Sequence, residues 1–309
     1  MGQATSIEWT DASWNPVRGC SRVSPGCENC YAERQAARFS GPGQPYEGLV
    51  RMGKQGPHWT GVVRVIREHL EDPLRWSKPR RIFVNSMSDV FHESLTDYQI
   101  ANIFSVMETA RGRGHTFQIL TKRAARMREW VAEWARKIDY ADDSGRGYLG
   151  RYGHVWLGVS VEDQERADER LPELVRTPAA VRFVSYEPAL EPVDFSRYLL
   201  PTHLEGHMAT TGVHWVIVGG ESGPGARPFE VEWARTTIAQ CKAAGVACFV
   251  KQMGRAPSML GIPVRFELAC SDGEPGWVEG KLRDAHGGDW DEWPPAFRVR
   301  EFPEGPGAP

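Results

Sequence analysis

Residues 82–89 read IFVNSMSD, and this short stretch shows the pattern that decides the fold. Its first three residues are apolar and β-prone, as in a strand that is buried on both faces, and polar side chains follow at once. Similar apolar runs recur along the chain, and segments with helical periodicity separate them. This alternation is typical of βα units around a parallel sheet.

The expected order of elements supports a barrel. Strands are expected at residues 13–17, 62–66, 82–85, 116–120, 155–161, 181–185, 215–218 and 246–250. Helices are expected at residues 28–39, 72–76, 98–111, 123–137, 164–175 and 231–244. Strands joined mostly by helical connections predict an α/β protein with a (βα) barrel, complete or partial.

The barrel is expected to span residues 1–254, followed by a short C-terminal appendage at residues 255–309. Pro, Gly, Trp and acidic residues accumulate after residue 254, which marks the change of character. Residues 40–60 are rich in Gly and Pro, and together with residues 142–153 they are expected to be loops that could cover a substrate.

Polar and charged side chains follow six successive expected strands. In a parallel barrel the carboxyl ends of the strands and the loops after them build the active site, so these side chains would converge on one mouth. Ordinary helix capping is the alternative. We expect Lys122, Glu162, Glu187 and Lys251 to orient substrate and transfer protons, because opposed charges in a dry site have shifted pKa values.

Three of the six cysteines lie close together, and Cys20, Cys27 and Cys30 have the spacing C-x6-C-x2-C. A structural zinc site requires four protein ligands, whereas an iron–sulfur cubane held by three cysteines leaves one iron open to a substrate or cofactor. The count of three therefore favours a catalytic cluster. The alternative is a zinc knuckle that a distant histidine completes, and the candidates are His58, His69 and His92.

Composition restricts the setting of this chemistry. The six cysteines do not form a secreted disulfide pattern, and Cys241, Cys248 and Cys270 have no mutual ligand spacing. No apolar run could span a bilayer and the N-terminus lacks a secretory pattern, so we expect an intracellular, cytoplasmic protein without a membrane partner. The net charge is -3, but residues 111–137 hold eight basic residues against two acidic ones, as in a nucleic-acid-binding surface or a solvated helix face.

The cysteine loop, residues 82–89, Ile119–Lys122 and Leu157–Val161 together resemble radical S-adenosylmethionine proteins of the spore-photoproduct-lyase-like kind. Residues 14–254 resemble, more closely, a phage and prophage family of three-cysteine radical-SAM-like proteins. The resemblance implies a [4Fe-4S] cluster on Cys20, Cys27 and Cys30, with S-adenosylmethionine on the fourth iron. Electron transfer would then yield methionine and a 5′-deoxyadenosyl radical. The common superfamily loop is C-x3-C-x2-C, so the first spacing is longer here.

The resemblance also suggests roles for residues at the strand ends. Ser88 and Asp89 are candidates to bind the ribose or methionine end of S-adenosylmethionine, with helix capping as the alternative. Gly219, Gly220 and Glu221 could let the backbone approach that cofactor, although the Gly-Gly-Glu of many members follows an early strand and this one follows a late strand. A plain tight turn is the alternative for the glycine pair.

Relatives of the phage family are associated with hypermodified thymine in viral DNA. The resemblance therefore implies an isomerase that acts on a nucleobase adduct such as glycinyl-thymidine, in the host cytoplasm if the chain is phage-encoded. Its partners would be DNA or a modified nucleotide, and an electron donor such as flavodoxin or ferredoxin. The alternatives are a photoproduct-lyase-type repair enzyme and a zinc-stabilised nucleic-acid-binding module without catalysis.

Overall fold

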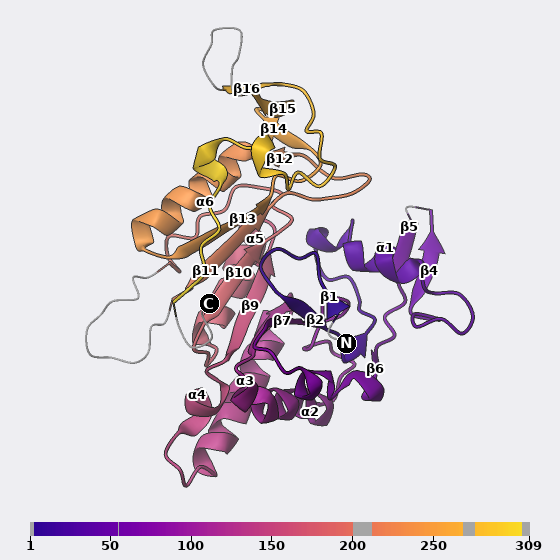
Figure 1. Cartoon of the computed structure of the whole chain (residues 1–309), viewed down its shortest axis with the longest axis vertical. Helices are drawn as coiled ribbons and strands as arrows, with labels where there is room; N and C mark the ends of the chain where they lie inside the picture. Colours follow the sequence, from indigo (N-terminus) through magenta and orange to yellow (C-terminus); the bar gives the residue numbers. More distant parts are fainter. Residues whose placement is uncertain (1–2, 55, 200–211, 268–275, 305–309) are drawn as a thin grey trace. The chain divides into compact units, whose positions relative to one another are not determined.

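A computed structural model describes residues 3–54, 56–199, 212–267 and 276–304 (Figure 1). The fold is mixed α/β, as predicted. Its main sheet has the strand order β1-β2-β7-β8-β9-β10-β11-β13, and all its strands from β2 onward run parallel. The strands are β1 (Gln3–Ala4), β2 (Ala12–Trp14), β7 (Arg81–Val84), β8 (Thr116–Thr121), β9 (Val155–Val161), β10 (Arg182–Tyr186), β11 (Trp215–Gly219) and β13 (Ala247–Gln252).

Parallel neighbours that follow one another in chain order are the topology of a partial (βα) barrel. Among the described strands the series is open, with β1 paired antiparallel to β2 at one edge and β13 at the other. The helices are α1 (Tyr31–Ala37), α2 (Asp97–Thr109), α3 (Ala124–Tyr140), α4 (Gly147–Tyr152), α5 (Gln164–Arg176) and α6 (Val231–Ala244).

Helix α2 shows how local sequence produces these elements. Thr96 caps its first turn by accepting from the Gln99 amide, and the Gln99 side chain accepts in return from the Thr96 amide. Ile100, Phe104 and Met107 recur at helical spacing and are fully buried. The buried stripe holds the helix against the core of its own unit.

Three predictions of strands and loops are wrong. Residues 62–66 do not join the parallel sheet, because β6 (Arg64–Val65) pairs antiparallel with β3 (Val17–Arg18). Residues 40–60 are not one loop but include the hairpin of β4 (Val50–Gly53) and β5 (Gly56–Trp59), which contacts α1 (Figure 1). Residues 142–153 contain α4, which Tyr148 and Tyr152 anchor in the core.

Short elements complete the chain. Residues 72–76 were expected to be a helix and form a single 3₁₀ turn. A second sheet has the order β12 (Phe229–Glu230), β14 (Pro257–Met259), β15 (Ile262–Glu267) and β16 (Gly276–Glu279). The 3₁₀ turns are η1 (Pro25–Cys27), η2 (Arg67–His69), η3 (Asp72–Arg75), η4 (Ala110–Arg113), η5 (Trp290–Glu292) and η6 (Pro295–Phe297).

The chain forms two compact units, and the expected boundary at residue 254 stays a prediction. Unit 1 comprises Met1–Val159, Glu173–Arg182 and Glu304–Pro309, and unit 2 comprises Ser160–Pro172 and Phe183–Pro303. Within unit 2 the segment from Val299 to Glu301 runs along β13, where the Val250 amide donates to the Val299 carbonyl at 2.8 Å. No helix in the described part of the chain is long and apolar enough to cross a membrane.

Candidate functional site

The cysteine loop begins at a position that only glycine can occupy. Gly19 has a φ of +90°, and a Cβ atom built there would lie 2.1 Å from the Val62 carbonyl oxygen. The backbone of Gly19 forms an isolated parallel bridge with Ser88. This close backbone contact places the start of the loop at the carboxyl end of β7.

Polar side chains after β7 hold the start of the loop in place. Ser88 Oγ donates to the Val17 carbonyl at 3.0 Å, and Asn85 Oδ1 accepts from the Val17 amide at 3.3 Å. Asn15 Oδ1 accepts from the Met87 amide at 3.1 Å. The hydroxyl of Ser88 therefore positions the loop, and its expected role in cofactor binding stays a prediction.

The three cysteines lie on this one loop and influence one another. Cys20 follows Gly19, Cys27 ends η1, and Cys30 is the N-cap residue of α1. Burial raises the pKa of the Cys20 thiol to about 12, with further contributions from Asp89 and from the other two cysteines. Burial also raises the pKa of Cys30, against hydrogen bonds from backbone amides that lower it. Without a metal, Cys20 and Cys30 are therefore protonated thiols at neutral pH.

The three cysteine thiols are the type of ligand that an iron–sulfur cluster requires. Cys20 and Cys30 pack against an apolar group that includes Leu49, Trp59 and Met87, so a group bound there would be shielded from water. Three cysteine sulfurs on one loop are the ligands such a cluster requires. In the described parts of the chain, however, no three Cys, His, Asp or Glu side chains are already arranged around a metal position.

Arg123 connects the cysteine loop to the ends of β7 and β8. Its Nη1 lies 3.0 Å from Asp89 Oδ2 and 3.9 Å from Cys20 Sγ. Its Nε donates to Glu93 at 2.8 Å and its Nη2 donates to Ser21 Oγ at 2.8 Å. Although burial opposes the charge, Asp89, Cys20 and Glu93 raise the pKa of Arg123 above its usual range, so the guanidinium is a permanent cation beside Cys20.

Asp89 is the acceptor that organises these groups. Its carboxylate is buried and accepts from Thr121 Oγ1 at 2.7 Å, from the Lys122 amide at 3.2 Å and from Arg123. It also accepts from the Phe91 amide at 2.9 Å. Asp89 and Lys122 are thus in contact through the Lys122 backbone amide, and the carboxylate has protein partners on both oxygens.

Sequence reasoning missed Arg123, Glu33 and Arg22 as members of this site. Glu33 is 1% exposed, and its Oε1 accepts from Arg22 Nε at 3.0 Å and from the Trp59 amide at 2.9 Å. This contact ties the cysteine loop to α1 and β5. The position of Arg123 directly after Thr121 and Lys122, at a strand end, was the available signal.

His92 is hydrogen-bonded to Ser21, the residue that follows Cys20 in the cysteine loop. Its Nδ1 accepts from the Ser94 amide at 3.1 Å, so the neutral ring carries its proton on Nε2 and donates to Ser21 Oγ at 2.9 Å. Burial and the charge of Arg123 lower the pKa of His92, which favours this neutral form. His69 pairs with Asp72 instead. The two ring nitrogens of His92 are therefore both engaged and neither is presented as a zinc ligand.

Unit 2 holds the remaining candidates in separate groups. Glu187 Oε1 accepts from Lys251 Nζ at 2.6 Å and from Gln252 Nε2 at 2.8 Å, so the structure brings Glu187 and Lys251 together. Gln252 Nε2 also donates to the Gly220 carbonyl at 3.1 Å. An ion pair at the ends of β10 and β13 could bind a polar substrate group or transfer a proton.

Glu162 lies elsewhere in unit 2 and is fully buried. Its Oε2 lies 3.0 Å from Arg170 Nη1, which also donates to the Ser160 carbonyl at 2.9 Å. The exposed fractions of the two side chains are 0% and 2%. This arrangement has the character of a structural ion pair that holds α5 to β9.

The Gly219-Gly220-Glu221 segment is packed tightly by the protein itself. A Cβ atom on Gly220 would lie 2.6 Å from the Met253 carbonyl oxygen, so the second glycine permits a close backbone contact. Glu221 accepts from the Arg227 amide at 2.9 Å and from Arg227 Nη2 at 2.7 Å. The geometry favours the tight-turn interpretation of this segment.

Replacement of Arg123 by glutamine tests how much the site depends on its buried cation. Asp89 keeps its bonds from Thr121 and Lys122 but loses its charged partner, so Arg123→Gln is expected to lower the free energy of unfolding by about 2–3 kcal/mol. Arg136→Gln, in an exposed pair with Glu133, is the control and should change it by less than about 0.5 kcal/mol in urea unfolding. Equal effects of the two variants would contradict a central role for Arg123.

The model of a family described as "Protein of unknown function (DUF5131)" matches residues 4–292, which is nearly the whole chain. The chain belongs to the DUF5131 family. No curated protein and no solved structure matches this DUF5131 member. The match spans the cysteine loop of unit 1 and both candidate groups of unit 2.

Proposed function

We propose that this protein is a radical enzyme that binds a [4Fe-4S] cluster through Cys20, Cys27 and Cys30 and cleaves S-adenosylmethionine. The observation that carries the proposal is the placement of the three-cysteine loop. Gly19 and Ser88 tie the loop to the carboxyl end of β7, where parallel βα enzymes hold their reactive groups. Three thiols without a fourth ligand suit a cluster with one open iron.

The charges around the loop support a negatively charged group. Three cysteinates give a [4Fe-4S] cluster a net negative charge, and such a charge needs compensation in a low-dielectric site. Arg123 places a guanidinium 3.9 Å from Cys20 Sγ, and backbone amides near Cys30 donate toward its sulfur. When bound, the cluster would supply the electron that splits S-adenosylmethionine into methionine and a 5′-deoxyadenosyl radical.

The chain's own residues have three tasks in this proposal. Cys20, Cys27 and Cys30 bind the cluster, and Arg123 stabilises its charge while Asp89 holds Arg123 in place. Trp59 and Met87 exclude water from the thiols. Lys122, Glu187 and Lys251 remain the candidates for substrate orientation and proton transfer, since Glu162 is committed to Arg170.

The substrate of the proposed enzyme is a nucleobase adduct in DNA or a modified nucleotide, such as thymine that carries glycine on its methyl carbon. Support comes from the resemblance to the three-cysteine phage family, and radical chemistry suits the step because an unactivated C–H bond must be broken. A donor such as flavodoxin or ferredoxin would supply the electron, in the cytoplasm. Repair of a DNA photoproduct keeps the same cofactor chemistry and is the alternative substrate class.

The proposal is tested by anaerobic reconstitution of the full chain with iron and sulfide, followed by dithionite and S-adenosylmethionine. We expect 5′-deoxyadenosine to accumulate, with about four iron atoms bound per chain. Chromatography measures the nucleoside and metal analysis measures the iron. A protein that holds one zinc ion tightly and forms no 5′-deoxyadenosine would instead be a zinc-stabilised binding module.

A further inference from the structure

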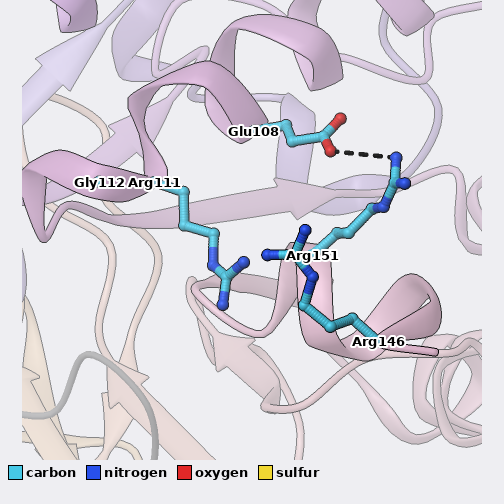
Figure 2. A pocket seen from close by; sticks show the side chains of 5 residues that line it. All are labelled: Glu108, Arg111, Gly112, Arg146 and Arg151. Atoms are coloured by element: carbon cyan, nitrogen blue, oxygen red, sulfur yellow. Dashed lines mark hydrogen bonds and ion pairs between the residues drawn. The ribbon is translucent and has the colours of Figure 1, made fainter. Parts of the chain in front are cut away.

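A pocket of about 630 Å³ lies in unit 1, away from the cysteine loop in the sequence (Figure 2). Its wall comes from the end of α2, from the η4 turn and from α4. Three of its five lining residues are arginines. The lining residues are Glu108, Arg111, Gly112, Arg146 and Arg151.

One of the three arginines is already neutralised. Arg151 lies 3.4 Å from Glu108 Oε1 and 3.2 Å from Asp142 Oδ1. Hydrogen bonds from Ser144 and from the Gly147 amide hold the pKa of Asp142 below its usual range, so this carboxylate stays charged. The other oxygen of Glu108 accepts from Tyr152 Oη at 3.1 Å. Arg151 therefore lies between two carboxylates, and the three arginines of the pocket together with Glu108 and Asp142 keep a net charge of +1.

The other two arginines face each other without an acid. Figure 2 shows the guanidinium groups of Arg111 and Arg146 pointing toward one another across the pocket. Arg146 Nε donates to the neutral Ser144 Oγ at 3.1 Å, and within the described residues no carboxylate lies at ion-pair distance from either guanidinium. Two like charges that converge in this way repel each other, and an anion between them would remove the repulsion.

The opening of the pocket leaves room for such an anion. Gly112 forms part of the wall, and a Cβ atom built there would meet nothing within 4 Å. A guanidinium offers a planar set of donors that matches phosphate oxygens in bidentate fashion. We propose that Arg111 and Arg146 form a phosphate-binding site, with Arg151 holding Glu108 aside. The volume admits a phosphate together with part of an attached sugar.

The structure also shows where the basic side chains of residues 111–137 lie. Arg123 faces Asp89, Arg128 pairs with Glu173, and Arg136 and Lys137 pair with Glu133. The folded chain therefore does not present the stretch as one free cationic surface. Arg111, the first residue of the stretch, lines the pocket with Arg146. Arg146 is 35 positions further along the sequence and lies outside the stretch.

The phosphate could belong to a small molecule or to a nucleic-acid strand, and two probes separate these sources. Binding of inorganic phosphate to the full chain is measured by calorimetry, and binding of a fluorescein-labelled single-stranded oligonucleotide by anisotropy. Both measurements use the full chain without a bound cluster. Their outcome therefore does not depend on whether the cluster proposal is correct. If the oligonucleotide binds and inorganic phosphate displaces it, the site binds a nucleic-acid strand. If only inorganic phosphate binds, the site binds a small phosphorylated molecule.

Arg111→Gln and Arg146→Gln are each expected to weaken binding of the bound probe about tenfold, the usual effect of losing one charge-assisted contact. For the oligonucleotide, the slope of log K against log salt should fall by about one in each variant. Arg136→Gln, an exposed arginine of the same unit, is the matched control and should bind like the wild type. Equal weakening by Arg136→Gln, unchanged binding in both pocket variants, or no binding of either probe would overturn the proposal.

Discussion

Replacement of Cys20, Cys27 or Cys30 by serine, one at a time, is expected to abolish cleavage of S-adenosylmethionine. Loss of a partner that only supports a metal ligand costs 10–100-fold, so loss of a ligand itself should reduce the rate to below about one hundredth of the wild type. A hydroxyl does not replace a thiolate as an iron–sulfur ligand. Each variant should also bind much less iron than the wild type, as measured by metal analysis after anaerobic reconstitution.

The matched control is a cysteine outside the loop. Cys241 is buried in α6, and Cys241→Ala removes a thiol without touching the cysteine loop. It should bind iron and form 5′-deoxyadenosine like the wild type. Cys270 is outside the described residues, and Cys270→Ser serves as a second control. Retained cleavage in all three loop variants would refute the cluster assignment, whereas loss in the controls as well would indicate general misfolding.

Arg170→Met is expected to lower the free energy of unfolding by about 3–5 kcal/mol, because it leaves Glu162 as an uncompensated charge in a fully buried place. Glu162→Gln should have an effect of similar direction, since Arg170 then lacks its counter-ion. The double variant Arg170→Met with Glu162→Gln should cost less than the two single effects added together. Urea unfolding measures all three.

Arg235→Gln is the control for this pair within the same unit. Arg235 and Glu232 form an ion pair whose side chains are more than half exposed, so the change should stay below about 0.5 kcal/mol. The same variants separate a structural role of Glu162 from the catalytic role that its position after a strand suggested. A Glu162→Gln protein with wild-type stability and no activity would favour catalysis and contradict our interpretation.

The sequence predicted most of the secondary structure that carries the site. The apolar runs at β7, β8, β9, β10, β11 and β13 are buried parallel strands, as expected, because continuous β-prone runs suit strands covered on both faces. The prediction that residues 62–66 join the parallel sheet was wrong because the length and composition of this run do not show which strand it pairs with. Pairing with β3 places it beside the cysteine loop instead of in the sheet.

The direction of side chains at the strand ends was not readable from sequence. Every residue of β9 is buried, so no alternation shows which face the next side chain takes, and Glu162 turned out to be enclosed with Arg170. Asp89 and Arg123 are 34 positions apart, and only the adjacency of β7 and β8 brings them together beside Cys20. Arg111 and Arg146 are also distant in the sequence, and they meet because η4 and the start of α4 line the same pocket.

By itself the sequence determined the α/β class, the succession of strands and helices, and the three-cysteine loop with its spacing. These depend on local apolar periodicity and on residues that are neighbours in the chain. Only the tertiary structure decided that Ser88 positions the loop, that Asp89 holds a guanidinium beside Cys20, and that two arginines converge on one pocket. Such contacts join distant residues, and their geometry is set by strand pairing and packing that no local pattern encodes.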